Sequence, residues 1–344
     1  MLINDNSAHS GLVNESDLLT KSINSDFDVI IIGAGAAGLM CAAQAGYRGR
    51  KVLVLDHAKQ AGKKILISGG GRCNFTNMDV EPNNFICANP HFVKSALSRY
   101  TQWDFLSLIA KYEVAYHERD FGQLFCDDSA KEIVRILKSE CDAANAQVRL
   151  RTDITSVEKT ADGFVIETPA QTYHAASLVI ATGGLSMPKL GATAFGYQLA
   201  EQFGLDVFPT RAGLVPVTLH QAQKDALAEL SGISLPVRIE SADGTVFGAD
   251  MLITHRGLSG PSVLQISNYW VPGEALSIDL LPSLDLADEL TTLRASNPNQ
   301  TLKNTLATWL PKRFVEVLLA IENIKDKPLK QLQHKEFDRV VDTL

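Results

Sequence analysis

Two glycine-rich stretches of the sequence contain the residue types from which a nucleotide site can be built. The first, DVIIIGAGAAGLMCAAQAG, places Gly33, Gly35 and Gly38 between an apolar run and a helix-forming stretch. In that context the first glycine allows a tight turn, the second leaves room for a pyrophosphate, and the third lets helix and strand pack closely. The helix start presents free N–H groups to the phosphates. The next strand, KVLVLD, ends at Asp56, whose carboxylate is placed to accept hydrogen bonds from ribose hydroxyls.

The second stretch, KKILISGGGRCNFTN, covers residues 63–77 and follows that acidic position. Its three glycines would allow close backbone contact with a ligand, and its arginine could neutralise phosphate charge. Taken from the residues alone, the stretch fits a cofactor contact and a surface turn whose arginine pairs with a carboxylate equally well.

The elements that must position these residues follow an α/β pattern. Apolar strands alternate with helical patterns from Asp28 to about Phe203, which predicts a parallel sheet. The run SLVIATGG, residues 177–184, is expected to be a buried strand with glycines at its carboxyl end, where open α/β sheets bind ligands. Before it, DITSVEK, GFVIETP and QTYHA alternate like a small antiparallel meander. Plain NAD domains usually lack this addition, so FAD is the favoured dinucleotide.

The composition changes twice further along the chain. Short β-rich runs such as LVPVTL, LPVRIE and ALSIDL suggest an antiparallel sheet or barrel, and DLADELTTL, TLKNTLATWL and KRFVEVLLAIE have helical spacing. We therefore expect a disordered tail at 1–27, an FAD-binding domain at 28–205, a β-rich barrel-like domain at 206–282 and a helical subdomain at 283–344.

Charge and cysteine usage exclude several classes of protein. The 344-residue chain has a formal net charge of −7, five cysteines without CxxC spacing, and no apolar run of transmembrane length. A negative chain without a Lys/Arg run would repel phosphate backbones. We expect a soluble, cytoplasmic protein with no metal site, no membrane contact and no nucleic-acid partner, and the oligomeric state is left open.

Longer motifs carry a resemblance to a known family. GAGAAGL, GKKILISGGGRCNFTN, ATGGLSMPKLGATAFGYQLAEQFG and THRGLSGPSVLQISNYW resemble the YhiN/BaiN-like family of NAD(P)/FAD-dependent oxidoreductases, the HI0933-like flavoproteins. The resemblance implies an FAD domain interrupted by a barrel and a helical subdomain. It also implies that the GGGRCN loop lies along the pyrophosphate and reaches toward the flavin ring, and that Ile154 lays its backbone against adenine.

Motif and resemblance together give the predicted cofactor-binding set: Gly33, Gly35, Ala36, Ala37, Gly38, Asp56, Lys63, Gly69, Gly70, Gly71, Arg72, Cys73, Asn74, Ile154, Ala181, Thr182, Gly183 and Gly184.

Other residues are weaker candidates. Cys73 lacks the second cysteine of a redox dithiol and is expected to fill space near the flavin ring. Thr193 lies in a turn where the family usually has Gly in place of Ala194, so close backbone approach is not expected there. His255 and Arg256 fit either a substrate face or a loop of the barrel. Pro261 replaces the last glycine of GxSxG and excludes a hydrolase.

The predicted activity is hydride transfer from NAD(P)H through FAD to a small acceptor, and the family resemblance implies a carbon–carbon double bond conjugated to a ketone as the candidate acceptor. A flavin monooxygenase and an inactive FAD-binding protein are the alternatives. The inactive protein is considered because GGV and GLYFAGE, motifs of the family's final FAD-domain segment, do not occur before Leu344.

Overall fold

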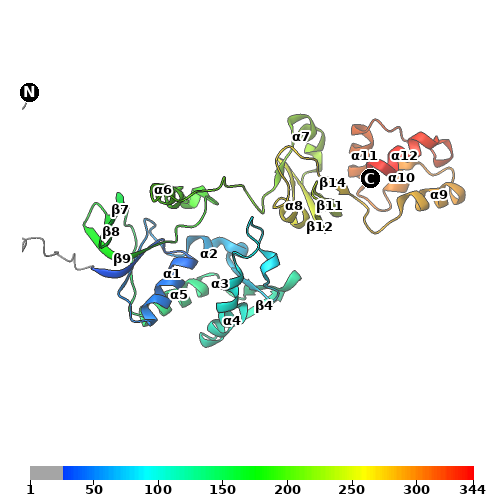
Figure 1. Cartoon of the computed structure of the whole chain (residues 1–344). Helices are drawn as coiled ribbons and strands as arrows, with labels where there is room; N and C mark the ends of the chain where they lie inside the picture. Colours follow the sequence, from blue (N-terminus) through cyan, green and yellow to red (C-terminus); the bar gives the residue numbers. More distant parts are fainter. Residues whose placement is uncertain (1–25) are drawn as a thin grey trace, which may run out of the picture. The chain divides into compact units, whose positions relative to one another are not determined.

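The computed structural model describes residues 26–344, which form two compact units, one ending at Phe208 and the other running from Pro209 to Leu344 (Figure 1). Most of the predicted disordered tail lies outside the described residues, but Phe27 already belongs to the first strand. Within residues 26–344, no helix combines the length and apolar character needed to cross a membrane.

A six-stranded sheet forms the centre of the first unit. Its strands are, in spatial order, β6 (Gln147–Arg149), β2 (Val52–Leu55), β1 (Phe27–Ile32), β9 (Thr172–Ile180), β8 (Gly163–Glu167) and β7 (Ser156–Thr160). Strands β6, β2, β1 and β9 pair in parallel, whereas β7, β8 and β9 pair antiparallel. This mixture confirms the predicted α/β class with its antiparallel meander.

Strand β9 joins the two kinds of pairing. The sequence suggested a meander strand and a separate buried strand here, but Thr172–Ile180 is one continuous strand. Its first part pairs antiparallel with β8, and the rest pairs in parallel with β1. Ala176, the one residue between the two predicted segments, therefore lies inside a strand.

Helices cover the sheet because the parallel strands are apolar on both faces. On β1, Ile31 packs with α1 and α5 on one face, whereas Ile30 and Ile32 face the meander strands and α6 on the other. The helices of this unit are α1 (Ala36–Tyr47), α2 (Lys63–Ile67), α3 (Lys94–Arg99), α4 (Gln102–Lys111), α5 (Lys131–Ala143) and α6 (Phe195–Gln202). Its short 3₁₀ turns are η2 (Ser68–Gly71), η3 (Pro82–Asn84), η4 (Asp120–Gly122) and η5 (Pro188–Leu190).

A buried carboxylate ties three of these helices together. Glu140 of α5 is 6% exposed and accepts hydrogen bonds from Tyr47 at the end of α1 and from Lys111 and Tyr112 at the end of α4. Burial alone would raise the pKa of Glu140, but these donors outweigh it and lower the pKa.

A small antiparallel sheet extends the first unit next to the second glycine stretch. It consists of β3 (Asn74–Asn77), β5 (Gln123–Cys126) and β4 (Tyr116–Arg119), in that order. Because β3 begins directly after Cys73, this sheet fixes the carboxyl end of the glycine loop.

The second unit combines a five-stranded antiparallel sheet with helices. The strands are, in spatial order, β10 (Val217–Thr218), β13 (Gly257–Ser259), β12 (Val246–Thr254), β11 (Ser234–Glu240) and β14 (Ser277–Asp279). The helical elements are α7 (Gln221–Leu227), η6 (Ala228–Leu230), α8 (Pro261–Ile266), α9 (Leu286–Ser296), α10 (Leu302–Leu306), α11 (Lys312–Ile321), η7 (Leu329–Gln331) and α12 (His334–Thr343).

One hydrophobic core serves both parts of the second unit. It includes Ile239 and Ile253 of the sheet together with Leu290, Leu306 and Val315 of the later helices. The helices thus share the core of the sheet, and the predicted boundary at residue 283 remains a proposal.

Candidate dinucleotide-binding site

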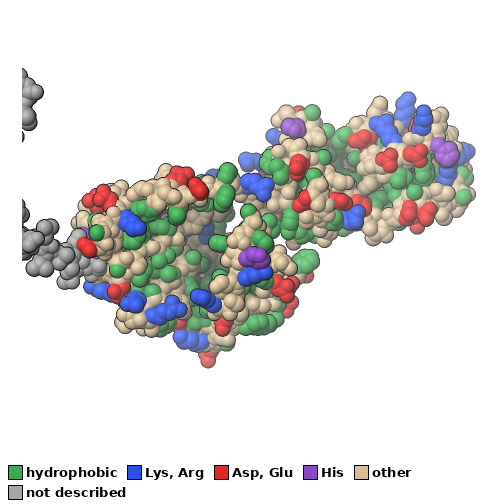
Figure 2. Space-filling model, viewed as in Figure 1, with side chains coloured by type: hydrophobic (Ala, Val, Ile, Leu, Met, Phe, Trp, Pro, Cys, Tyr) green, Lys and Arg blue, Asp and Glu red, His purple; other side chains and the backbone are tan. Residues whose placement is uncertain are grey.

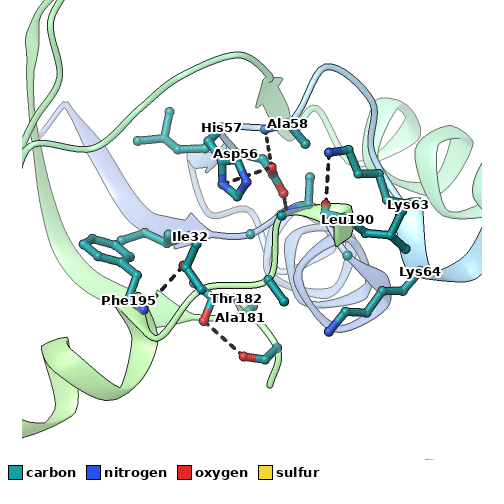
Figure 3. Close-up of a pocket in the computed structure, with 18 of the residues that line it drawn as sticks. Ile32, Asp56, His57, Ala58, Lys63, Lys64, Ala181, Thr182, Leu190 and Phe195 are labelled. Atoms are coloured by element: carbon teal, nitrogen blue, oxygen red, sulfur yellow. Dashed lines mark hydrogen bonds and ion pairs between the residues drawn. The ribbon is translucent and has the colours of Figure 1, made fainter. Parts of the chain in front are cut away.

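A pocket of about 910 Å³ lies at the carboxyl ends of β1, β2 and β9 (Figure 3). This is the edge at which open α/β sheets bind ligands. From the predicted cofactor set, the pocket is lined by Gly33, Gly35, Ala36, Ala37, Asp56, Lys63, Ile154, Ala181, Thr182 and Gly183. The structure thus brings together residues from five separate stretches of the sequence.

The three glycines of the first turn have different surroundings. A Cβ on Gly38 would lie 1.8 Å from the carbonyl oxygen of Gly33, and a Cβ on Gly33 would lie 2.4 Å from that of Ala181. A Cβ on Gly35, which lines the pocket, would meet nothing within 4 Å. Two glycines therefore allow close packing, and Gly35 leaves open space at the start of α1.

The N-terminus of α1 also faces this pocket through Gly35, Ala36 and Ala37. Gly35 is the N-cap residue, and no side chain caps the helix. The first N–H groups of a helix and its dipole attract anions. An anionic ligand in the pocket would thus find N–H donors at the helix start.

Asp56 is held rigidly at the end of β2. Its Oδ2 accepts from the backbone N–H of Ala34 at 2.6 Å, and its Oδ1 accepts from that of Ala58 at 2.7 Å. Each carboxylate oxygen keeps a further lone pair for a ligand hydroxyl. Figure 3 shows the neighbouring His57 beside the carboxylate, with Nδ1 3.9 Å from Oδ1.

Two lysines of α2, Lys63 and Lys64, line the pocket. Lys63 donates through Nζ to the carbonyl of Leu190 at 3.1 Å (Figure 3). Lys64 donates to the carbonyl of Gly184 at 3.0 Å and to the hydroxyl of Ser186 at 3.1 Å. These bonds fasten α2 to the segment after β9 and place two positive charges at the pocket.

The glycine loop of the second stretch, residues 69–74, does not line this pocket, although Lys63, Lys64 and Ile65 at the start of that stretch do. Gly69, Gly70 and Gly71 have φ values of +55°, +67° and +88°, in the left-handed region that favours glycine. A Cβ on Gly69 would lie 2.6 Å from the ring of Phe125, whereas one on Gly70 would meet nothing within 4 Å. Gly38 and Gly184 and the residues Arg72, Cys73 and Asn74 are likewise absent from the lining. Contact between the GGGRCN loop and the cofactor remains a prediction.

Cys73 is almost completely buried at the end of this loop, at 5% exposure. Burial raises its pKa, and a hydrogen bond with Ser68 lowers it to a smaller extent. The thiol is thus uncharged at neutral pH, which fits a packing role better than nucleophilic chemistry.

His255 and Arg256 lie at the exposed turn between β12 and β13 in the second unit. The hydroxyl of Thr254 accepts hydrogen bonds from the backbone N–H groups of Arg256 and Gly257 at 3.3 and 3.2 Å. These bonds support the loop interpretation, and neither candidate lines the pocket of the first unit.

Several pocket residues were missed by the sequence argument. Lys64 and His57 each follow a predicted residue directly, and basic or aromatic neighbours of a phosphate site were a usable signal. Thr193 and Ala194, for which close approach was not expected, do line the pocket. The other missed lining residues are Ile32, Ala34, Leu55, Ala58, Gln60, Gly62, Ile65, Thr152, Asp153, Ile180, Leu190, Gly191, Ala192, Phe195 and Gln198.

Family models match most of the described chain. The HI0933-like protein Rossmann domain matches residues 27–259, and the HI0933-like protein barrel and H2TH domain matches residues 211–344. The chain belongs to the HI0933-like family. The predicted family and the barrel-containing architecture are therefore confirmed.

Curated relatives of this HI0933-like protein carry two different names. The chain is 56% identical to a ribosomal RNA dihydrouridine synthase of Escherichia coli, over 92% of this chain and 80% of that protein. It is 50% identical to the Haemophilus influenzae protein of the same name, over 91% and 79%. It is 25% identical to a 3-dehydro-bile acid delta(4,6)-reductase of Clostridium scindens, over 90% and 79%.

These relatives correct two expectations. The prediction of a small-molecule reductase was wrong, and neither the monooxygenase nor the inactive protein is better supported, because the two relatives at 50% identity or more are named for modifying ribosomal RNA. The exclusion of a nucleic-acid partner was wrong for the same reason. Its physical basis was weak because net charge is a sum over the whole chain, whereas RNA contacts depend on the local surface.

Proposed function

We propose that this chain binds FAD in the pocket of its first unit and reduces uridine in ribosomal RNA to dihydrouridine. The observation that carries the substrate is the 56% identity to the Escherichia coli enzyme across 92% of the chain. We also propose NAD(P)H as the reductant that makes the reaction catalytic.

The pocket residues fit the ADP half of FAD. The uncapped start of α1 and the open space at Gly35 suit a pyrophosphate, and Lys63 and Lys64 suit its negative charge. Asp56 would hold the ribose through its remaining lone pairs, and the Thr152–Ile154 segment would border the adenine. A small residue at position 35 is the feature that the pyrophosphate needs most.

The target double bond in uracil has the chemistry of a conjugated ketone. C5 and C6 are joined by a double bond in conjugation with the C4 carbonyl, so hydride adds at C6 and a proton adds at C5. When bound, FAD supplies that hydride after reduction. The chain's own task is to bind the cofactor, hold it in one orientation, and admit a base to it.

The experiment is complementation of an Escherichia coli strain that lacks its ribosomal RNA dihydrouridine synthase. Expression of this chain should restore dihydrouridine in purified ribosomal RNA, measured by mass spectrometry of the digested nucleosides. A Gly35→Val variant expressed at the same level should not restore it. Ribosomal RNA that still lacks dihydrouridine when the chain is folded and carries FAD would refute the proposal.

A further inference from the structure

A short segment of the second unit concentrates positive charge in a chain whose net charge is −7. Residues 325–335, KDKPLKQLQHK, contain four lysines and one histidine against a single aspartate. We call these residues the lysine loop. Figure 2 shows Lys and Arg side chains along the upper edge of the helical part of this unit.

The backbone of the lysine loop is anchored to the core. Leu329 and Leu332 are 1% and 2% exposed, so the loop is fixed from beneath by apolar contacts. The N–H of Leu329 donates to the carbonyl of Gln300 at 2.9 Å, and the carbonyl of Lys327 accepts from the N–H of Leu302 at 2.9 Å. An anchored backbone lowers the entropy lost when its side chains engage a partner.

Most of the lysine side chains on this loop point into solvent. Lys325, Lys330 and Lys335 are exposed, and none of the three forms an ion pair with the residues that the structure describes. Lys327 differs, because its ammonium pairs with Glu336 at 2.5 Å. The aspartate of the loop, Asp326, accepts from the backbone N–H of Lys303 at 3.0 Å.

We propose that the lysine loop binds phosphates of the ribosomal RNA backbone and so docks the substrate. The proposal rests on the proposed function. Lysine contacts phosphates as a point charge and positions a protein on nucleic acid without reading sequence. Three ammonium groups that form no ion pair with the described residues, on an anchored loop, are complementary to the regular negative charge of an RNA strand.

The test measures binding of deproteinised ribosomal RNA, purified from the synthase-lacking strain, as a function of salt. One variant combines Lys325→Gln, Lys330→Gln and Lys335→Gln. The matched control combines Lys131→Gln, Lys138→Gln and Lys159→Gln, which are exposed lysines of the first unit and give the same change in net charge. Both variants should keep wild-type melting temperature and FAD content.

We expect the loop variant to bind at least about tenfold more weakly and to reduce the slope of log K against log salt by about 2, since each lost phosphate contact removes about 0.7 to 0.9. The affinity of the control variant for RNA should stay within about twofold of the wild-type value. Equal losses in both variants, or a wild-type slope in the loop variant, would overturn the proposal. If the loop variant binds free RNA normally but binds intact ribosomal subunits more weakly, the loop contacts a ribosomal protein instead of RNA. That result would also overturn the proposal.

The same samples separate this inference from the proposed function. If wild-type protein binds ribosomal RNA through the loop yet leaves no dihydrouridine in it, the proposed function fails while the docking surface stands. If the loop variant forms dihydrouridine at the wild-type rate and binds ribosomal RNA with wild-type affinity, only the proposed docking surface fails.

Discussion

The first unit contains two glycine-rich turns that look alike in sequence and differ in what surrounds them. In the first turn, Gly33 and Gly38 are in tight contact with neighbouring backbone, and Gly35 borders the open pocket. In the second, Gly69, Gly70 and Gly71 all have positive φ, and none lines that pocket. The glycines thus differ in what a Cβ would do: it would collide with packed backbone at Gly33 and Gly38, enter the open pocket at Gly35, and strain the backbone at the second turn. Substitutions can separate these effects.

The largest expected effect is at Gly38, where Gly38→Ala would force α1 away from β1. Because the new Cβ would lie 1.8 Å from a backbone oxygen, we expect the free energy of unfolding to fall by about 3 kcal/mol or more. Urea denaturation of the FAD-free protein measures it. The control is Gly35→Ala, which adds a Cβ in open space and should cost no more than about 1 kcal/mol for the poorer N-cap. Equal losses of unfolding free energy in Gly38→Ala and Gly35→Ala would show that the two glycines do not differ in packing.

Gly35→Val should act on the cofactor and not on the fold. A branched side chain would fill the space assigned to the pyrophosphate, so we expect FAD affinity to drop by about a hundredfold, with little change in urea midpoint. Titration of the apo protein with FAD, followed by flavin fluorescence, gives the affinity. Full FAD content in the purified variant would place the pyrophosphate elsewhere.

In the second turn, substitutions can likewise separate the effect of packing from that of backbone conformation, and the expected losses of stability are smaller. Gly70→Ala should cost about 1 kcal/mol of stability for its left-handed backbone alone. Gly69→Ala should cost more, because its Cβ would also meet the ring of Phe125 at 2.6 Å. Thermal or urea unfolding ranks the two variants. If the loop reaches bound flavin, Gly70→Ala will additionally weaken FAD binding; unchanged affinity would remove the loop from the site.

The smallest effect is expected at Cys73, which ends the second turn. Because burial raises the pKa of its thiol above the ordinary value of 9.0, the thiolate is scarce at neutral pH and forms only as pH rises beyond that value. Cys73→Ala should keep bound FAD and its reduction rate by NAD(P)H within about tenfold of wild type. Stopped-flow bleaching of the flavin measures the rate. A loss of several orders of magnitude with FAD still bound would give the thiol a chemical role.

The sequence was most informative where local pattern and function coincide. The strand, glycines and helix around Gly33 were predicted because their spacing is set by contacts within one βαβ unit. Gly69 lies so close to the ring of Phe125, far along the chain, that a Cβ would not fit, and no local pattern reports such a contact. The same holds for Glu140, whose three donors come from two other helices.

The exclusion of a nucleic-acid partner failed for a different physical reason. The family resemblance was right, but a net charge of −7 was treated as evidence against RNA. The KDKPLKQLQHK segment contains a local excess of lysine that the sequence already displays, although only the structure shows that its two leucines are buried while Lys325, Lys330 and Lys335 are exposed. Whether a protein can bind RNA has to be judged from the charge of its local surface and not from the net charge of the whole chain.

The long strand β9 has a consequence for how the protein emerges during synthesis. Strand β1 pairs with β9 from Phe27↔Ala175 to Ile32↔Ile180, so the centre of the sheet cannot close until residues far downstream are available. Closing so long a loop is slow, and an unpaired apolar strand edge favours aggregation in the meantime. Until β9 has been translated, the edge of β1 at Ile30, Ile31 and Ile32 lacks its partner strand. The pocket at the carboxyl ends of β1, β2 and β9 needs that late pairing, because Ile180 and Ala181 form part of its lining.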